Sequence, residues 1–259
     1  DFWYYADGSG NLYAGEFKTI KGKKYAFRDD GRMLDGLRFI KEDADNQHLD
    51  VRSDDDKDEP FDNEDDFLEN AVNYYEENGY KCYYFGDGDD GAMRTNKTTV
   101  EIDGEKHNFY FEKSGGHKGA GVTGEKDDKL YQSGMLLKAD SDDKYIVVEK
   151  YTRTVNGEEV VTYKKLDDAK EFMAAIEDNY VLTDELDGKS GKDSVDVGNG
   201  NTKKAEDLSE AYTIDYNGAN KNTAYEYILV NTSGKIVDTK SKSKDGSDYY
   251  YVTKKATGG

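Results

Sequence analysis

The sequence predicts a mainly β protein made of repeated β-hairpins, a β-solenoid-like array, with two inserted α-helices. Tyrosine and phenylalanine recur at alternate positions, and Asp-Gly, Asn-Gly or Ser-Gly pairs follow them. Alternating aromatic side chains suit a pleated strand, and these pairs supply the positive φ of tight turns. The same phrase recurs along 259 residues. Because one hairpin is marginal in water, we expect the copies to stack.

Composition predicts a thin structure with an aromatic core. Only 35% of the residues are hydrophobic and 36% are charged, yet 13% are aromatic, including 22 tyrosines. Disordered chains are poor in aromatic residues, so we expect a folded, elongated chain. The net charge of −20 disfavours nucleic acid and anionic membranes as partners. No stretch approaches the ~18 apolar residues of a membrane span.

The repeated phrases occupy three segments, which we expect to be hairpin domains: residues 1–40, 80–150 and 208–259. The clearest copies are "WYYADGSGNLYAGEF", "KYAFRDDGRMLDGL", "CYYFGDGDDGAM" and "IDGEKHNFYFEKSGGHKGAG". Looser copies are "KLYQSGMLLKADSDDKYIVV" and "EYILVNTSGKIVDTKSKSKDGSDYYYV". The chain opens inside a repeat phrase and lacks a secretory signal, so we expect a processed protein or a piece of a longer one.

Two insertions separate these segments. Residues 41–79 form an acidic insertion that we expect to interrupt the array, with a helix capped by Asp62 or Asn63 and ended by Gly79. Residues 151–207 are predicted to hold a second helix and a Gly/Asp-rich linker over 184–207. The apolar stripes are Phe67, Leu68, Ala71, Val72 and Tyr75 in the first helix, and Leu166, Ala169, Phe172, Met173 and Ile176 in the second.

The stretch "WYYADGSGNLYAGEFKTIKGKKYAFRDDGRMLDGL" resembles two consecutive cell-wall-binding repeats, the choline- and glucan-binding repeat family of Gram-positive surface proteins. The resemblance is most specific over 1–40, weaker over 80–122, and loose over 128–150 and 224–252. It implies a β-solenoid of hairpins, an extracellular, cell-wall-associated location, and cell-wall polysaccharide or teichoic acid as partner. A host or bacterial surface protein is the alternative partner.

The resemblance also implies where a ligand would bind. Choline cages of the family use two tryptophans per repeat, and this chain keeps only Trp3. The other matching positions hold Glu16, Lys24, Leu37, Cys82, Asn108 and Val122. Because a quaternary ammonium needs several aromatic faces, a glycan is the expected ligand rather than choline. The candidate ligand-binding aromatic residues are Trp3, Tyr5, Tyr25, Phe27, Tyr84, Tyr110 and Phe111, most of which are expected to be core and a minority exposed.

Other chemistry is weakly signalled. Asp54, Asp56 and Asp58 alternate like the start of a calcium loop, but Glu59 stands where that loop needs glycine. We therefore expect a solvated acidic loop and no metal or cofactor, with calcium as the alternative. Cys82 is expected to be a small buried hydrophobic residue and His107 an exposed strand residue.

Glycine spacings also match nucleotide motifs by chance. Gly86-x-Gly88-x-x-Gly91 and Gly119-x-Gly121-x-x-Gly124 fit a dinucleotide fingerprint, but no helical pattern follows either one. The sequence thus predicts a non-catalytic surface module that attaches or spaces a protein at the cell wall. An adhesion module that uses the repeats as scaffold is one alternative. A glycan hydrolase, whose carboxylates cannot be paired from sequence, is another.

Overall fold

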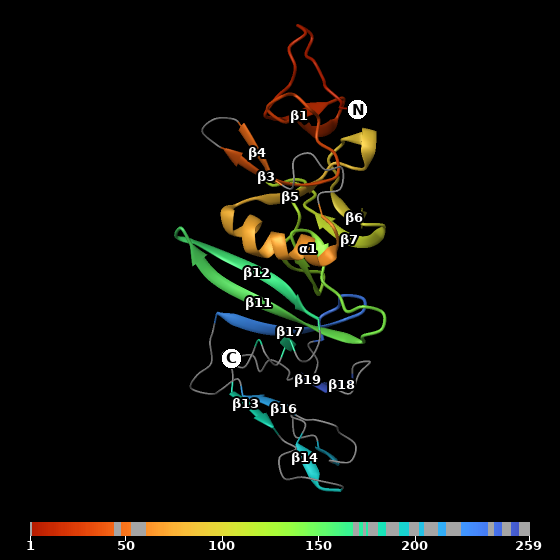
Figure 1. The fold of residues 1–259 in the computed structure, drawn as a ribbon, viewed down its shortest axis with the longest axis vertical. Coiled ribbons are helices and arrows are strands. Elements are labelled where there is room, and N and C mark those ends of the chain that lie inside the picture. The colour runs from red at the N-terminus through yellow and green to blue at the C-terminus, as the bar shows by residue number, and fades with distance from the viewer. Residues whose placement is uncertain are drawn as a thin grey trace. The chain divides into compact units, whose positions relative to one another are not determined.

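The computed structural model describes residues 2–43, 48–52, 61–167, 171–172, 175, 181–184, 192–196, 202–204, 212–215, 224–237, 241–244 and 250–253. Figure 1 shows that these residues form mostly strands, which confirms the prediction of a mainly β chain. The chain divides into two compact units: Asp1–Gly124 with Tyr131–Leu136, and Glu125–Leu130 with Leu137–Gly259. No helix in the described part has the length and apolar character needed to span a bilayer.

The strands of the first 136 residues form three small sheets. β1 (Phe17–Ile20) pairs with β2 (Lys23–Ala26). A second sheet has the order β4 (His48–Arg52), β3 (Leu37–Asp43), β5 (Lys81–Tyr84). The third has the order β6 (Asn96–Ile102), β7 (Glu105–Phe111), β10 (Met135–Leu136), β9 (Lys129–Gln132), β8 (Gly124–Lys126).

Six hairpins share one pattern of backbone hydrogen bonds. In each, an N–H of the returning segment donates to a carbonyl of the first segment at 2.7–3.0 Å. We number them hairpins 1 to 6: residues 3–13, 24–34, 82–94, 108–122, 128–137 and 227–237. The bonds, donor first, are Tyr13–Tyr5, Leu34–Ala26, Arg94–Tyr84, Val122–Tyr110, Leu137–Leu130 and Val237–Leu229. The loose sequence copies therefore follow the same backbone register as the clear ones.

A second recurring bond joins hairpins to one another. We call the residue just before each returning donor the methionine position, and the first residue of each hairpin the tryptophan position. The N–H at the methionine position donates to the carbonyl at the tryptophan position of the preceding hairpin, at 2.7–2.9 Å. These bonds run from Met33 to Trp3, Met93 to Lys24, Gly121 to Cys82, and Ile236 to Asp128. Hairpins 1 to 4 are thus stacked in order within the first unit.

A glycine two residues before the methionine position makes this stacking possible. Gly31, Gly91 and Gly119 have φ of 84°, 57° and 90°. A Cβ on Gly91 would lie 2.7 Å from Met33 Sδ, and one on Gly119 would lie 2.8 Å from Met93 Cγ. The side chain of one hairpin therefore occupies the space left free by the glycine of the next. The apparent dinucleotide fingerprints contain these turn glycines, which explains their spacing.

The first predicted helix is confirmed. α1 (Glu64–Asn70) continues through a π-helical turn (Ala71–Tyr75) and a 3-10 turn (Glu76–Asn78). The Asn63 side chain accepts a hydrogen bond from the Asp66 N–H, and Gly79 ends the segment with φ of 81°. Phe67 is fully buried, and the Tyr75 ring stacks on Phe39 at 4.2 Å. The apolar stripe thus packs on β3.

The insertion lies beside the hairpin stack rather than within it. Met93 of hairpin 3 donates directly to the Lys24 carbonyl of hairpin 2, although the insertion separates them in sequence. Part of the inserted chain is also strand, because β3 and β4 pair from Phe39–Arg52 to Asp43–His48. Hairpins 2 and 3 are therefore neighbours in space, although residues 41–79 separate them in the sequence.

The second unit contains a long hairpin that the sequence analysis did not predict. β11 (Tyr145–Val155) pairs with β12 (Glu158–Leu166) across a turn at Asn156 and Gly157, and with β17 (Tyr225–Asn231) on its other side. Shorter pairs are β13 (Val181–Asp184) with β16 (Tyr212–Asp215), β14 (Ser194–Asp196) with β15 (Thr202–Lys204), and β18 (Ser241–Lys244) with β19 (Tyr250–Thr253). The β14–β15 pair lies in the segment expected to be a linker.

The second predicted helix lies largely outside the described residues. Glu171, Phe172 and Ala175 are helical. Leu166, which we expected in the helical stripe, instead ends β12. It still joins the expected apolar group, because Phe172 and Ala175 pack against the cluster of Val147, Leu166 and Leu229.

Candidate functional site

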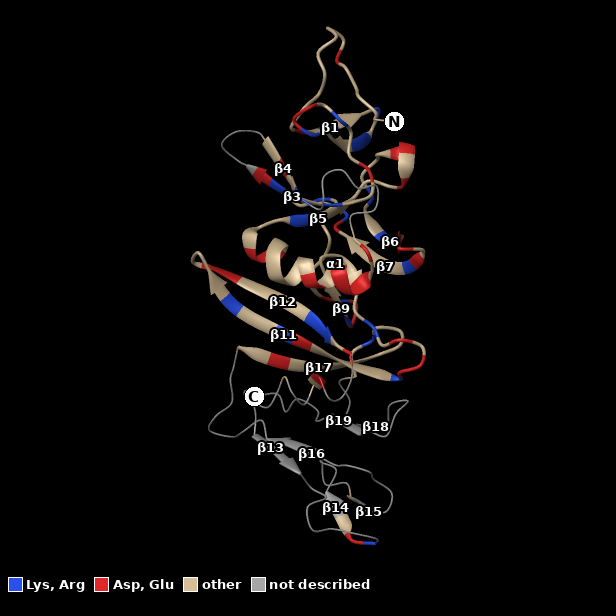
Figure 2. Cartoon of the chain, in the orientation of Figure 1, with Lys and Arg blue, Asp and Glu red and all other residues tan. Residues whose placement is uncertain are grey.

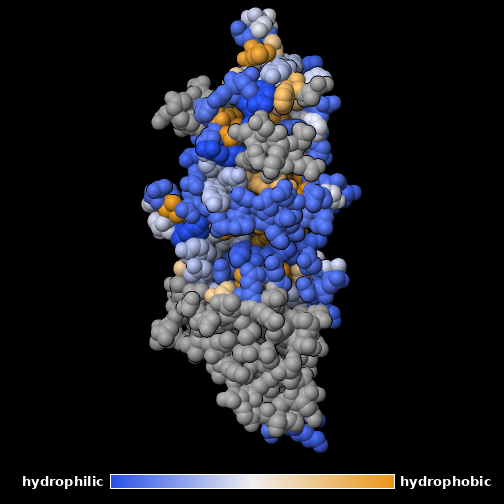
Figure 3. Space-filling view, in the orientation of Figure 1, coloured by the Kyte–Doolittle hydropathy of each residue, from blue (hydrophilic) through white to orange (hydrophobic). Residues whose placement is uncertain are grey.

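The first hairpin exposes a run of aromatic side chains. Phe2, Trp3, Tyr4 and Tyr5 are 65%, 53%, 47% and 40% exposed, and we call them the N-terminal aromatic cluster. In the described part of the chain, only Leu12 and Tyr74 are other large hydrophobic residues with comparable exposure. Figure 3 shows small orange patches among blue at the upper end of the view; its hydropathy scale does not colour tryptophan and tyrosine as hydrophobic. Such a contiguous exposed group is unusual in a chain this polar.

Polar and ring contacts hold the cluster in place. Trp3 Nε1 donates to Asp89 Oδ1 at 2.7 Å, which connects hairpin 1 to the turn of hairpin 3. The Tyr5 ring stacks on Tyr13 at 6.0 Å. The turn of hairpin 1 is closed by Asp7, whose carboxylate accepts backbone N–H bonds from Asn11 and Ser9. These bonds lower the pKa of Asp7 and keep it ionised.

Nearby aromatic rings already face cations of the chain. The Arg32 guanidinium lies 4.7 Å from the Phe2 ring centre, Lys18 Nζ lies 4.5 Å from Tyr13, and Lys24 Nζ lies 4.3 Å from Phe17. Lys24 occupies the tryptophan position of hairpin 2. Each of these three rings thus already makes a cation–π contact with a side chain of the protein.

The structure divides the seven predicted ligand-binding residues. Trp3 and Tyr5 are exposed, and Tyr25 is half-buried. The other four are at most 4% exposed and belong to the core: Phe27, Tyr84, Tyr110 and Phe111. The sequence analysis had allowed for this core role. The sequence analysis did not name Phe2 and Tyr4, which are also exposed and lie on either side of Trp3 in the sequence. Their adjacency to Trp3 was the signal that they could share its exposure.

Three further residues can be placed. Cys82 is fully buried, as predicted, and burial raises the pKa of its thiol well above the ordinary value. His107 is only 7% exposed, so the expectation of an exposed strand residue was wrong. Its Nδ1 lies 3.5 Å from Glu64 Oε2, because the start of α1 covers this part of β7.

The described residues provide no evidence for a metal site. Asp54, Asp56 and Asp58, the calcium candidates, lie outside the described residues. Among the residues that are described, no group of three or more His, Cys, Asp or Glu side chains is arranged to hold a metal ion. Figure 2 shows that the described strands and loops present basic as well as acidic residues.

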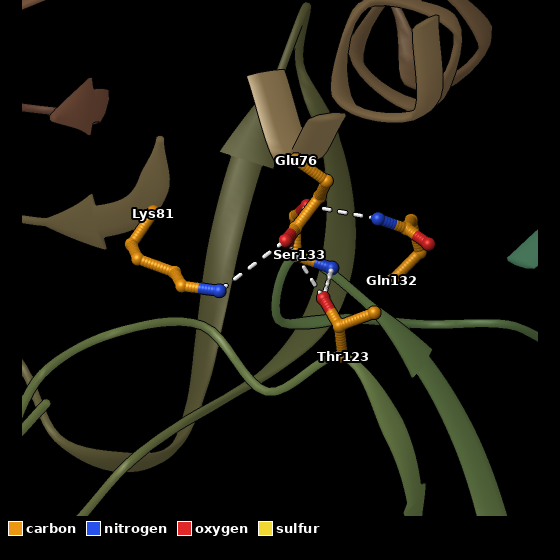
Figure 4. A network of polar contacts seen from close by, with 5 residues as sticks. All are labelled: Glu76, Lys81, Thr123, Gln132 and Ser133. Atoms are coloured by element: carbon orange, nitrogen blue, oxygen red, sulfur yellow. Dashed lines mark hydrogen bonds and ion pairs between the residues drawn. The ribbon is translucent and has the colours of Figure 1, made fainter. Parts of the chain in front are cut away.

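A buried polar network joins the insertion to Thr123, which directly follows hairpin 4, and to hairpin 5. Glu76 is 8% exposed, and its Oε1 accepts hydrogen bonds from Thr123 Oγ1 at 2.7 Å and Ser133 Oγ at 2.8 Å. Its Oε2 lies 3.5 Å from Lys81 Nζ. Gln132 Nε2 donates to Ser133 Oγ at 3.1 Å, as Figure 4 shows. Because hydroxyl groups and an ammonium surround the carboxylate, this network anchors the insertion.

Comparison with known proteins gives distant likenesses. No protein-family model and no curated protein matches the chain. Choline binding protein F from Streptococcus pneumoniae is 18% identical over 53% of this chain and 44% of that chain, with a TM-score of 0.18. The Cpl-1 endolysin, complexed with a peptidoglycan analogue, is 15% identical over 92% of this chain and 37% of that chain, with a TM-score of 0.26.

A third likeness is to an alternansucrase in complex with isomaltononaose. It is 16% identical over 97% of this chain and 15% of that chain, with a TM-score of 0.18. This chain therefore spans less than half the length of each of these three proteins. Likenesses this low do not assign it to a family.

Proposed function

We propose that this chain is a non-catalytic, extracellular module that attaches or spaces a surface protein at a Gram-positive cell wall. Its ligand is a wall glycan, bound at the N-terminal aromatic cluster, and its hairpins form a β-solenoid-like array. The observation on which the proposal rests is the exposure of Phe2, Trp3, Tyr4 and Tyr5 in one run. The cell-wall location follows from the resemblance of "WYYADGSGNLYAGEF" to cell-wall-binding repeats.

The geometry of the cluster favours a sugar. Aromatic rings with one exposed face stack on the apolar face of a pyranose while their polar atoms remain hydrated. The bond from Trp3 to Asp89 holds the indole in one orientation. Less side-chain entropy is therefore lost when a ligand binds.

The charges disfavour choline and teichoic-acid phosphate. Within the cluster, a choline group at Phe2 would have to compete with Arg32, which is covalently held beside that ring. Lys18 and Lys24 lie beside the neighbouring rings of Tyr13 and Phe17. Teichoic-acid phosphate would meet a protein of net charge −20. A neutral polysaccharide has neither disadvantage, so it is the ligand that these charges favour.

The single tryptophan gives a direct test, because all indole emission comes from Trp3. We expect purified cell-wall polysaccharide to shift this emission, and choline to leave it unchanged below about millimolar concentration. The Trp3→Ala variant has no indole emission, so its binding is measured instead by co-sedimentation with insoluble cell walls. The matched control is Tyr74→Ala, which removes an aromatic residue that is 62% exposed on the insertion.

Loss of wall binding in Trp3→Ala and its retention in Tyr74→Ala would support the proposal. Equal binding by both variants would contradict the cluster as the site. Micromolar choline affinity by calorimetry would contradict the preference for glycan. Release of reducing sugar from the walls by the purified chain would show a hydrolase and contradict the non-catalytic role.

A further inference from the structure

We propose that Tyr151 and Tyr225 form an oxidative cross-linking site, where a haem peroxidase with hydrogen peroxide joins the two rings as dityrosine. The two residues are distant in the sequence and lie on β11 and β17, which Figure 1 shows side by side. Both strands belong to the second unit. The inference concerns a covalent modification and does not depend on wall binding.

The backbone places the two tyrosines directly opposite one another. β11 and β17 are antiparallel, and Tyr151 pairs with Tyr225 at the end of their ladder. The next pair strengthens this register on the other face of the sheet, because Lys150 Nζ lies 2.5 Å from Glu226 Oε2. Side chains directly opposite one another on the same face are the closest neighbours that two strands provide.

The two rings are stacked face to face. Their centres lie 4.5 Å apart, and their planes differ by 6°. Among the described residues, the other ring contacts between two tyrosines have centres 5.8–6.0 Å apart. Burial, and after it electrostatic repulsion and hydrogen bonding with Tyr151, raise the pKa of Tyr225. Because the hydroxyl groups interact, they lie at the same end of the stack, and the ring carbons beside them lie close together.

A third side chain holds the Tyr151 ring in this position. The Arg153 guanidinium lies 4.9 Å from the Tyr151 ring centre, and its Nη1 donates to Thr162 Oγ1 at 3.0 Å. Thr162 is the residue opposite Tyr151 on β12. The ring is therefore held from the β12 side and faces Tyr225 on the β17 side. Because rings fixed in contact need little reorientation, their coupling is favoured over coupling with another chain.

The reaction removes one hydrogen atom from each tyrosine. Each phenol gives one electron and its hydroxyl proton to the oxidant, and the two phenoxyl radicals form a carbon–carbon bond between the ring carbons beside the hydroxyl groups. The hydrogen atoms of those carbons then move to the oxygens and restore both phenols. Hydrogen peroxide takes up the two electrons and two protons and leaves as two molecules of water. The product joins β11 to β17 covalently.

The test oxidises the full chain with a haem peroxidase and hydrogen peroxide at low protein concentration, and isolates the monomer by gel filtration. Trypsin releases residues 151–153 as one peptide and residues 222–235 as another, because lysine or arginine borders each of them. We expect mass spectrometry of the monomer to find these two peptides joined, with the loss of two hydrogen atoms. The same fraction should show dityrosine fluorescence.

Tyr225→Phe keeps the ring and removes the phenol, so the joined peptides should be lost. The matched control is Tyr227→Phe, which removes a hydroxyl bonded to Glu149 at 3.0 Å and lies in the same peptide and strand. This variant should still form the link. The link also closes a long loop in the unfolded chain, so the urea midpoint should rise in the oxidised parent and not in oxidised Tyr225→Phe.

Three outcomes would overturn the proposal. The parent monomer could lack the joined peptides although the peroxidase has modified exposed tyrosines such as Tyr4 and Tyr74. The joined peptides could occur only in a dimer fraction, which would place the link between two chains. Tyr225→Phe could form them and Tyr227→Phe could fail to do so, which would place the link at Tyr227.

Discussion

At the scale of single residues, the stack depends on positions where two hairpins touch. In hairpins 2 and 3 the methionine position supplies both a backbone donor and a side chain, and a glycine of the next hairpin leaves the space for that side chain. Lys24 and Cys82, which stand at the tryptophan positions of hairpins 2 and 3, accept the stacking bond through their carbonyls. Because this bond is made by the backbone, it does not depend on the side chain at the tryptophan position.

Gly91→Ala tests the glycine position. The added Cβ meets the Met33 side chain, and φ of 57° strains any L-residue. We expect the variant to lose about 2–4 kcal/mol of unfolding free energy in urea melts. Gly22→Ala is the matched control, because Gly22 has φ of 82° but nothing within 4 Å of its Cβ. Equal losses in the two variants would show that backbone strain alone sets the cost.

Tyr83 gives a pH dependence with a definite sign. Burial, with smaller contributions from Glu42 and Cys82, raises its pKa from 10.0 to about 12. The folded state therefore retains the phenol proton more strongly than the unfolded state. The stability that Tyr83 contributes is complete below about pH 10 and is lost as the pH rises toward about 12.

Unfolding free energies of Tyr83→Phe and the parent, measured from about pH 9 to about pH 11, check this prediction. The variant should lose less stability than the parent over that range. Tyr4→Phe, which alters a hydroxyl that is exposed in the folded chain, should behave like the parent. A parent and a Tyr83→Phe variant with the same alkaline slope would contradict the assigned burial effect.

At the scale of elements, the helical part of the insertion is attached to the rest of the first unit at two places. The stripe of α1 packs on β3, where Phe67 lies 5.6 Å from Phe39 between ring centres. The 3-10 turn is attached by Glu76, which binds Thr123, directly after hairpin 4, and Ser133 of hairpin 5. An aromatic contact and a polar one thus fix the two ends of a single inserted segment.

Glu76→Ala tests the polar attachment. It would leave the Thr123 and Ser133 hydroxyl groups without their acceptor, and we expect a loss of about 2–3 kcal/mol in unfolding free energy. Glu69→Ala, an exposed acidic residue on α1, should change stability by less than about 0.5 kcal/mol. If both losses were below that value, the network would contribute nothing measurable to docking.

At the scale of the whole molecule, the two compact units predict that unfolding is not a single transition. Trp3 emission reports only on the first unit, whereas far-ultraviolet circular dichroism reports on strands of both. We expect the two urea curves to differ in midpoint. Coincident curves for both probes would indicate that the units unfold together.

Leu68→Ala identifies which transition belongs to the first unit. Leu68 is 6% exposed in the helical stripe, so its truncation should cost about 2–4 kcal/mol through lost transfer energy and a cavity. The midpoint of Trp3 emission should fall, while the transition seen only by circular dichroism should stay in place. A shift of both transitions by the same amount would contradict separate unfolding.

The sequence by itself determined the local structure of this protein. The hairpin turns follow from glycine at positive φ, as at Gly31, and the helix limits follow from Asn63 and Gly79, because these conformations depend on residues a few positions apart. The β11–β12 hairpin carried a similar signal in Asn156-Gly157, but the adjacent charged residues concealed it.

Only the tertiary structure decided which aromatic faces are covered and which hairpins are neighbours. Alternation along a strand separates two faces but does not say which one receives a neighbour, so Phe27 and Phe111 could not be distinguished from Trp3 by spacing. His107 is buried by a helix that is distant in sequence. Hairpins 2 and 3 meet across the insertion because the Met33 side chain fits against Gly91, a contact between residues that no local pattern connects.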